Sequence, residues 1–150
     1  MRAVIQRVSE ASVVVEDEKV ANIQQGLLVL LGIETEDSKE DADWLANKIS
    51  ALRIFSDEEG VMNKAITEIG GEAIVVSQFT LHAKTKKGNR PSYIKSARTE
   101  QAIPLYDQFK NELSIVIGKQ VQSGEFGADM KVSLVNDGPV TIIIDSKNKE

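Results

Sequence analysis

The chain begins with apolar stretches separated by short polar breaks, a pattern typical of β-structure. Residues 1–15 are rich in β-branched apolar side chains and predict a strand, and residues 20–23 are expected to pair back on it after the charged turn EDEK. Residues 27–31 (LLVLL) are uniformly apolar and lie between two glycines. A continuous run of this kind indicates a central strand whose two faces are both covered.

Strand-like runs return in the second half of the chain. Residues 53–55 fit a short strand, residues 73–76 (AIVV) a buried one, and residues 132–135 and 140–145 two more. Residues 136–139 (NDGP) separate the last two. Because Asn-Asp-Gly is a common turn sequence, a hairpin turn is the simplest interpretation of this break.

Two other segments show the 3.6-residue apolar period of amphipathic helices. The first is expected to begin at Ser38, a favourable N-cap residue with acidic residues after it. Its apolar stripe comprises Ala42, Leu45, Ala46, Ile49 and Leu52. The second helix is expected to begin near Thr99, to tolerate Pro104 if this residue lies in the first turn, and to end before Gly118.

This order of strands, helix, strand, helix and strands predicts an α/β fold with two long helices on one side of a sheet. The length of 150 residues is typical of a single domain, residues 1–150. No apolar run reaches the ~20 residues of a membrane span. Charges interrupt the N-terminal apolar run, which is therefore unlike a signal peptide, and a cytoplasmic location is expected.

The scarcity of reactive side chains limits the chemistry. The chain has no cysteine and a single histidine, His82. This excludes disulfides, thiolate nucleophiles and metal sites with two histidines from one chain, and a Ser-His-Asp triad would have to use His82. The acidic clusters in residues 34–37 and 40–43 are expected to form a solvated loop and a helix start. No metal ion and no cofactor are predicted.

Polar side chains follow directly on the buried strand at residues 73–76. They are Ser77, Gln78 and Thr80, with Phe79 among them. A buried polar group without a partner costs roughly 1–3 kcal/mol, so these side chains either bond to the backbone or face a ligand. Strand ends in α/β sheets are common ligand sites. The alternative is a strand that simply runs into an exposed loop.

Positive charge is concentrated in one part of a chain whose net charge is −5. Residues 73–99 contain no acidic residue and six basic ones: Lys84, Lys86, Lys87, Arg90, Lys95 and Arg98. Such a patch can steer a polyanion to one place on an otherwise acidic protein. A solvated loop explains the same residues equally well, and residues 84–96 are expected to form a loop.

Several segments together resemble one known family. The segments MRAVIQRV, GLLVLLGIE, VVSQFTL, KKGNRPS, FGADM and VSLVNDGPVTIIID occur in this order along the whole chain. In this combination they are similar to the D-aminoacyl-tRNA deacylases of the bacterial and eukaryotic type. The pair SQFT plus NDGPVT is far more specific than either motif alone.

The resemblance implies an enzyme that hydrolyses the ester between a D-amino acid, or glycine, and the 3′-terminal adenosine of tRNA. It implies rejection of L-aminoacyl-tRNA, and hence a proofreading role in translation. It further implies a three-layer α/β/β domain that works as a homodimer with its active sites at the interface, without a cofactor.

Two motifs carry the site residues that the resemblance implies. The first motif is assigned to catalysis: Ser77, Gln78, Phe79 and Thr80. Substrate binding is assigned to the second motif and to one residue of FGADM: Asn136, Gly138, Pro139, Val140, Thr141 and Met130. In the family a Gly–cis-Pro pair enters the partner subunit's pocket and excludes the side chain of an L-amino acid. Contacts with RNA phosphates are expected from Lys84, Lys86, Lys87 and Arg90.

Three mechanisms remain open with so few bases. In the first, Thr80 or Ser77 is a nucleophile that His82 activates. In the second, backbone N–H groups near Phe79 and Thr80 hold the oxyanion while water attacks, and in the third the ribose 2′-hydroxyl assists. The second and third together are favoured. Two rival functions also remain, a non-catalytic nucleic-acid-binding dimer and a Ser/Thr esterase that acts on small molecules.

Overall fold

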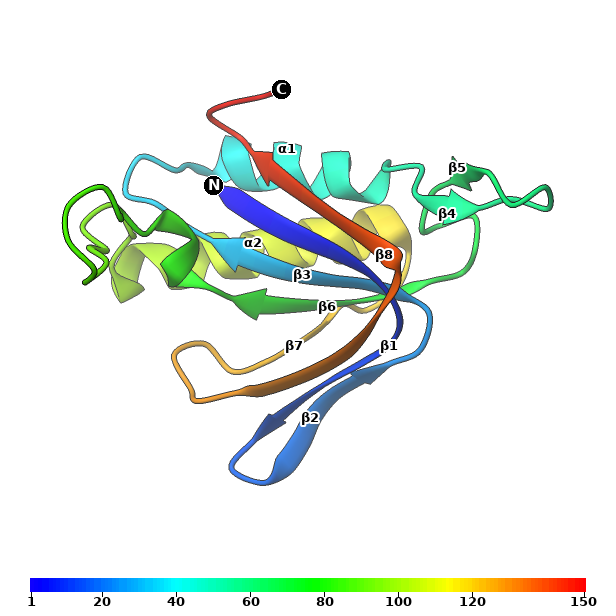
Figure 1. Cartoon of the computed structure of the whole chain (residues 1–150), viewed down its shortest axis with the longest axis horizontal. Helices are drawn as coiled ribbons and strands as arrows, with labels where there is room; N and C mark the ends of the chain where they lie inside the picture. The colour runs from blue at the N-terminus through cyan, green and yellow to red at the C-terminus, as the bar shows by residue number, and fades with distance from the viewer.

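The predicted strands and helices are present in a computed structural model of the protein, which describes residues 1–150 (Figure 1). In chain order the elements are β1 (Arg2–Val15), β2 (Glu18–Ile23), β3 (Gly26–Gly32), α1 (Lys39–Ser50), β4 (Phe55–Ser56), β5 (Met62–Lys64), β6 (Glu72–Ser77), η1 (Phe79–His82), α2 (Thr99–Ile117), β7 (Gln122–Ser123) and β8 (Lys131–Asp145). The element η1 is one turn of 3₁₀-helix. None of the helices has both the length and the apolar character needed to span a bilayer.

Six strands form one mixed sheet in the order β2-β1-β3-β6-β7, and β8 pairs with β1. β1 is antiparallel to β2, β3 and β8, whereas β6 is parallel to both β3 and β7. Because β3 and β6 are parallel, their carboxyl ends lie at the same edge of the sheet. β4 and β5 form a separate hairpin that projects from the body (Figure 1). The short strand predicted at residues 53–55 therefore begins later, at Phe55, and its partner β5 was not predicted.

The sheet has a hydrophobic core on each of its faces. Both long helices cover one face (Figure 1). Leu27, Val29 and Leu31 of β3 belong to the core beneath them. Leu28 of β3 points the other way, into a second core that β2 and the distal half of β1 enclose. The residues of β6 alternate between the two cores in the same manner. The α/β fold with three layers and the doubly covered central strand are thereby confirmed.

The helix ends follow the predicted signals closely, with two exceptions. Ser38 caps α1 in a capping box with Asp41, and Gly118 ends α2 at a φ of 71°, a conformation that favours glycine. Leu52 lies beyond α1, which ends at Ser50. Pro104 does not meet the condition set for it, because it lies in the second turn of α2, where it removes one backbone donor from the helix.

The break predicted at residues 136–139 is not a hairpin turn. β8 runs through it as one strand paired to β1, and its register shifts so that residues 137–140 lie opposite the single residue Arg7. The motif is therefore an irregular bulge of four residues against one, and a bulge keeps the strand direction while it displaces residues from the ladder. The Gly138–Pro139 peptide bond within it is cis.

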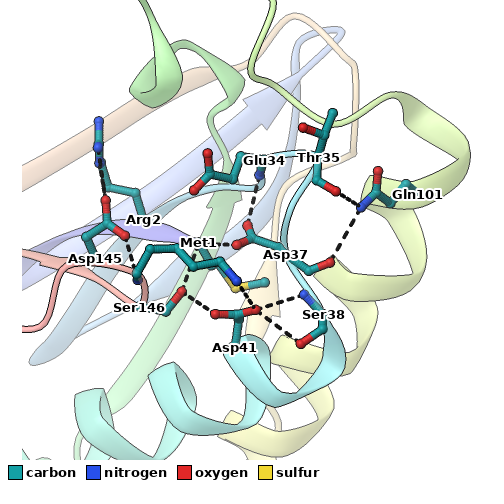
Figure 2. Close-up of polar contacts among 11 residues, drawn as sticks. Met1, Arg2, Glu34, Thr35, Asp37, Ser38, Asp41, Gln101, Asp145 and Ser146 are labelled. Atoms are coloured by element: carbon teal, nitrogen blue, oxygen red, sulfur yellow. Dashed lines mark hydrogen bonds and ion pairs between the residues drawn. The ribbon is translucent and has the colours of Figure 1, made fainter.

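A buried polar cluster joins the two ends of the chain. The ammonium group of Met1 is fully buried, forms an ion pair with Asp37 and donates a hydrogen bond to Ser146 Oγ at 2.8 Å (Figure 2). Ser146 Oγ in turn donates to Asp41 Oδ1 at 2.7 Å. These four residues, Met1, Asp37, Asp41 and Ser146, are called the Met1 cluster below. The expectation that residues 34–37 and 40–43 form only a solvated loop and helix start was wrong for Asp37 and Asp41.

Candidate active site

A cavity lies at the carboxyl end of β6, beside the end of β3. Its volume is about 300 Å³, and ten of its thirteen lining residues are hydrophobic. Ser77 is the last residue of β6 and pairs with Leu31, and the N–H of Gln78 donates to the Leu31 carbonyl at 2.8 Å. The parallel ladder thus continues up to the cavity and fixes the backbone there. Ser77 and Gln78, which follow the buried strand, therefore line a cavity and do not simply run into an exposed loop.

Three of the four residues assigned to catalysis line this cavity: Ser77, Gln78 and Phe79. Thr80 does not line it, but its Oγ1 accepts a hydrogen bond from Gln78 Nε2. The chain turns into η1 at this point, and the first bond of that turn is the one from Leu81 N–H to the Gln78 carbonyl. The first N–H groups of a helical turn have no hydrogen-bond partner within that turn. The N–H groups of Phe79 and Thr80 therefore form no hydrogen bond within η1.

The opposite wall comes from the segment before β8. Met130, which was assigned to substrate binding, lines the cavity together with Phe126 and Gly127. The Phe126 ring packs edge-on against Tyr106, with ring centroids 5.6 Å apart. Tyr106 donates a hydrogen bond to the Val75 carbonyl at 2.9 Å, and burial raises its pKa to about 12. Tyr106 is therefore a neutral support that fixes Phe126 to β6.

The cavity contains no ionisable side chain. Its polar lining consists of Ser77 and Gln78, and every carboxylate, imidazole, ammonium and guanidinium group lies elsewhere. His82 is buried and also lies outside the lining, with no hydrogen-bond partner at Nε2. A nucleophilic hydroxyl needs an adjacent base. The structure of the single chain places no such base in the cavity.

The second motif lies away from this cavity within one chain. Neither Gly138 nor Pro139 lines it, and both are exposed on the bulge of β8. Gly138 has a φ of 134°, and a Cβ at this position would approach Val140 Cγ2 at 2.8 Å and Arg7 Nη2 at 2.9 Å. The position therefore requires glycine for two separate reasons, backbone conformation and space.

The remaining residues of the second motif hold the bulge together. Asn136 Oδ1 accepts a hydrogen bond from the Val140 N–H at 3.1 Å, and Asn136 Nδ2 donates to Thr141 Oγ1 at 3.0 Å. The same Nδ2 also donates to Gln6 Oε1. Asn136, Val140 and Thr141 thus act on the shape of the bulge and do not reach the cavity of their own chain.

Arg7 is a residue in contact with the second motif that the sequence analysis missed. Its side chain is only 11% exposed, and its Nε donates to the Asp137 carbonyl at 2.9 Å. Its Nη1 donates to the Ile54 carbonyl at 2.7 Å. Arg7 therefore braces the chain immediately before Gly138 from the neighbouring strand. A charged residue in the middle of the apolar run AVIQRV was the signal that could have identified it.

The predicted RNA-contacting residues lie together in the segment between η1 and α2. Residues 84–98 are called the basic loop below, and all six of its cations are exposed: Lys84, Lys86, Lys87, Arg90, Lys95 and Arg98. None of them belongs to the ion pairs of the structure, which use other basic groups. The basic loop thus presents uncompensated positive charge near the cavity. It adjoins the cavity at Ala97, which lines it, and at Ser96, which bonds to the carbonyl of the lining residue Phe79.

The fold and the cavity define a small α/β protein with a candidate ligand site at the carboxyl ends of two parallel strands. Comparison with known proteins makes this specific. A profile of the D-Tyr-tRNA(Tyr) deacylase family matches residues 4–145. A D-aminoacyl-tRNA deacylase of Bacteroides fragilis is 65% identical over the full length of both chains, and one of Flavobacterium johnsoniae is 62% identical over the same span.

Two solved structures share the fold of this chain. The structure of a c-Myc DNA unwinding element binding protein is 41% identical, superposes with a TM-score of 0.91, and covers 97% of this chain and 98% of its own. A probable eukaryotic D-amino acid tRNA deacylase shares the fold at 17% identity, with a TM-score of 0.80 over 95% of this chain and 97% of its own. The chain belongs to the D-Tyr-tRNA(Tyr) deacylase family, and the predicted class of enzyme, a hydrolase that acts on ester bonds, is confirmed.

Proposed function

We propose that the protein hydrolyses the ester that joins a D-amino acid, or glycine, to the 3′-terminal adenosine of tRNA, and that it spares the L-aminoacyl ester. The names of its relatives support the substrate class. The observation that carries the mechanism is the absence of any ionisable side chain from a cavity that the SQFT motif lines. Such a site suits a substrate that is already activated and brings its own hydroxyl groups.

In the proposed mechanism the attacking oxygen is that of water, and the ribose 2′-hydroxyl beside the ester assists. The backbone N–H groups of Phe79 and Thr80 stabilise the oxyanion that forms on the ester carbonyl, and preorganised donors of this kind are an effective source of rate enhancement. Ser77 and Gln78 hold the strand end and orient the ester. The products are the free amino acid and tRNA with an intact terminal ribose.

The proposed chiral selection requires a second copy of the chain. The bulge at Gly138–Pro139 is exposed on its own subunit, and Arg7 braces it in place. Two apolar side chains of the same strand are also exposed, Val135 at 49% and Ile143 at 68%. We therefore place the bulge of one subunit in the cavity of the other, where it blocks the space that an L side chain needs. The proposed homodimer follows from this assignment, and the proposed cytoplasmic location follows from aminoacyl-tRNA as the substrate.

One relative favours a second candidate function. The solved structure at 41% identity is named for binding a DNA element, and the basic loop would suit a non-catalytic nucleic-acid-binding dimer. The deacylase name, however, is carried by relatives that are 62–65% identical over the full chain. The hydrolase is therefore the proposed function, and nucleic-acid binding serves it by presenting the substrate.

The decisive experiment compares three esters of tRNA, namely D-tyrosyl, L-tyrosyl and glycyl, at low enzyme concentration. We expect rapid release of D-tyrosine and glycine and slow release of L-tyrosine. Equal release of both tyrosine enantiomers would retain the hydrolase and reject the chiral barrier. Binding of tRNA without release of any amino acid would favour the nucleic-acid-binding function.

A further inference from the structure

Two exposed aromatic rings stand at the rim of the cavity. Phe79 lines the cavity and is nevertheless 56% exposed, and Tyr93 beside it is 38% exposed. Their ring centroids are 5.0 Å apart and their planes meet at 75°, an edge-to-face contact. The two rings are thus covered much less than aromatic rings in a protein core. The pair therefore presents exposed ring surface to any part of a ligand that extends out of the cavity.

The aromatic pair is held in place by bonds at the base of the basic loop. Lys84 and Ser92 exchange two backbone hydrogen bonds, at 2.8 and 3.0 Å, and so close the loop immediately before Tyr93. On the other side of Tyr93, Ser96 Oγ donates to the Phe79 carbonyl at 2.9 Å. The backbone on both sides of Tyr93 is thus anchored next to Phe79, which lowers the entropic cost of ordering this segment on binding.

The segment that carries Tyr93 is strongly positive. Tyr93 lies within the basic loop, whose six cations form no ion pair within the chain. Aromatic rings interleaved with unpaired cations are the combination that proteins use for single-stranded nucleic acid, in which bases stack on rings while the backbone follows positive charge. A second apolar protein surface would gain nothing from these charges.

We propose that Tyr93, together with Phe79, stacks against the base of the unpaired nucleotide that precedes the terminal adenosine. This inference rests on the proposed function, in which the terminal nucleoside ester occupies the cavity. The preceding nucleotide then has to cross the rim where Phe79 stands, and its phosphate comes next to the basic loop. Tyr93 is a binding residue in this arrangement and takes no part in the chemistry.

The test compares a substrate that contains the preceding nucleotide with one that does not. The first is D-tyrosyl-tRNA, and the second is the D-tyrosyl ester of adenosine alone. In Tyr93→Leu we expect KM for the tRNA ester to rise roughly 5- to 150-fold, the range that corresponds to the loss of one stacked base, with kcat little changed. KM for the adenosine ester should stay at the wild-type value, and Tyr93→Phe should keep wild-type KM for both.

Ile115→Ser is the matched control, because Ile115 is an exposed apolar residue, at 73%, in the last turn of α2 and outside the site. It should leave both KM values unchanged. An equal rise in KM for both substrates in Tyr93→Leu would show that Tyr93 only supports the cavity. Unchanged KM for the tRNA ester would exclude stacking. A changed oligomeric state of Tyr93→Leu in light scattering would assign the pair to a subunit contact.

A readout independent of turnover separates this inference from the proposed function. The probe is a short RNA that ends in adenosine and carries 2-aminopurine as the preceding base. Stacking should quench its fluorescence on binding to the wild type and Tyr93→Phe, and not to Tyr93→Leu. Quenching without hydrolysis of any ester would reject the proposed function and keep the stacking site. Hydrolysis without quenching would keep the proposed function and reject the stacking site.

Discussion

The Met1 cluster and the basic loop hold their charges in opposite ways. In the Met1 cluster a buried ammonium meets a buried carboxylate, and the neighbouring hydroxyl and carboxylate groups satisfy each other (Figure 2). In the basic loop six cations are exposed and meet no carboxylate of the chain. The first arrangement stabilises the fold, because its charges are paired within the chain and need no ligand. The second contributes little to stability, so its charges are available for a partner outside the chain.

The largest effect is expected from breaking the buried pair. Asp37→Ala leaves the Met1 ammonium buried without its counter-charge, and removal of one partner from such a pair typically destabilises a protein by about 3–5 kcal/mol. The free energy of unfolding, measured by urea titration, should fall by that amount. Glu36→Ala, at an exposed neighbouring position, should stay within about 0.5 kcal/mol of the wild type. A similar small change in Asp37→Ala would contradict the role given to the pair.

Arg7 is a nearly buried and paired cation, like the Met1 ammonium, but its partner Asp137 belongs to the second motif. Gly138→Ala tests this brace, because the new Cβ would meet Arg7 Nη2 and Val140 in a backbone conformation that alanine avoids. We expect kcat/KM for the D-tyrosyl ester to fall about 100-fold, as displacements of ~1 Å at a site can produce. A variant with normal folding and unchanged kinetics for D, L and glycyl esters would remove the bulge from the proposed site.

A smaller effect is expected from neutralising the basic loop. The double variant Lys86→Ala/Lys87→Ala should raise KM for aminoacyl-tRNA and flatten its dependence on the logarithm of salt concentration by roughly 0.7 for each phosphate that the loop no longer neutralises. Unfolding free energy should stay within about 0.5 kcal/mol of the wild type. Lys39→Ala removes a surface lysine that is already paired with Asp43, and it serves as the control. Equal salt dependence in all three proteins would reject the loop as an RNA contact.

The smallest effect concerns pH. Burial would raise the pKa of Asp41, but hydrogen bonds from Ser146, Ser38 and Lys147 outweigh it and hold the pKa well below the usual value of 3.8. A depressed carboxyl pKa contributes stability that is fully present above pH 3.8 and is lost as the pH falls toward the folded-state pKa.

Asp41→Asn should therefore be less stable than the wild type at neutral pH, and the difference should shrink as the pH is lowered below 3.8. Urea unfolding at pH 7 and near pH 3 measures both differences. A gap between the two proteins that is constant with pH would show that Asp41 contributes through packing alone.

The sequence predicts the strands and helices of this fold well, and the register between paired strands less well. The apolar run at residues 27–31 correctly indicated a strand with two covered faces, and Ser38 and Gly118 marked helix ends. The same pattern could not show that residues 137–140 bulge, because a bulge depends on the register with β1 and on side chains from Gln6 and Arg7. Local turn preference at Asn-Asp-Gly favoured a hairpin, and the pairing of the whole strand overrode it.

The candidate site divides in the same way. Ser77 and Gln78 were singled out because polar residues at the end of a buried strand are conspicuous, and both line the cavity together with Phe79. The cavity itself depends on Phe126 and Met130, which come from a segment about fifty residues later and look like ordinary apolar anchors. Asp37 was misjudged because its partner is the ammonium group of Met1, a group that no residue pattern displays.

The bulge of β8 also has a consequence for solubility. β8 is fifteen residues long and pairs only with β1, so its outer edge is open to the strands of other chains. Long open edges of this kind promote aggregation, and natural proteins interrupt them with proline and with bulges. Residues 137–140 supply both devices in the middle of the strand. The segment proposed to select the substrate thus also divides the open edge into two short stretches, each a poor template for an intruding strand.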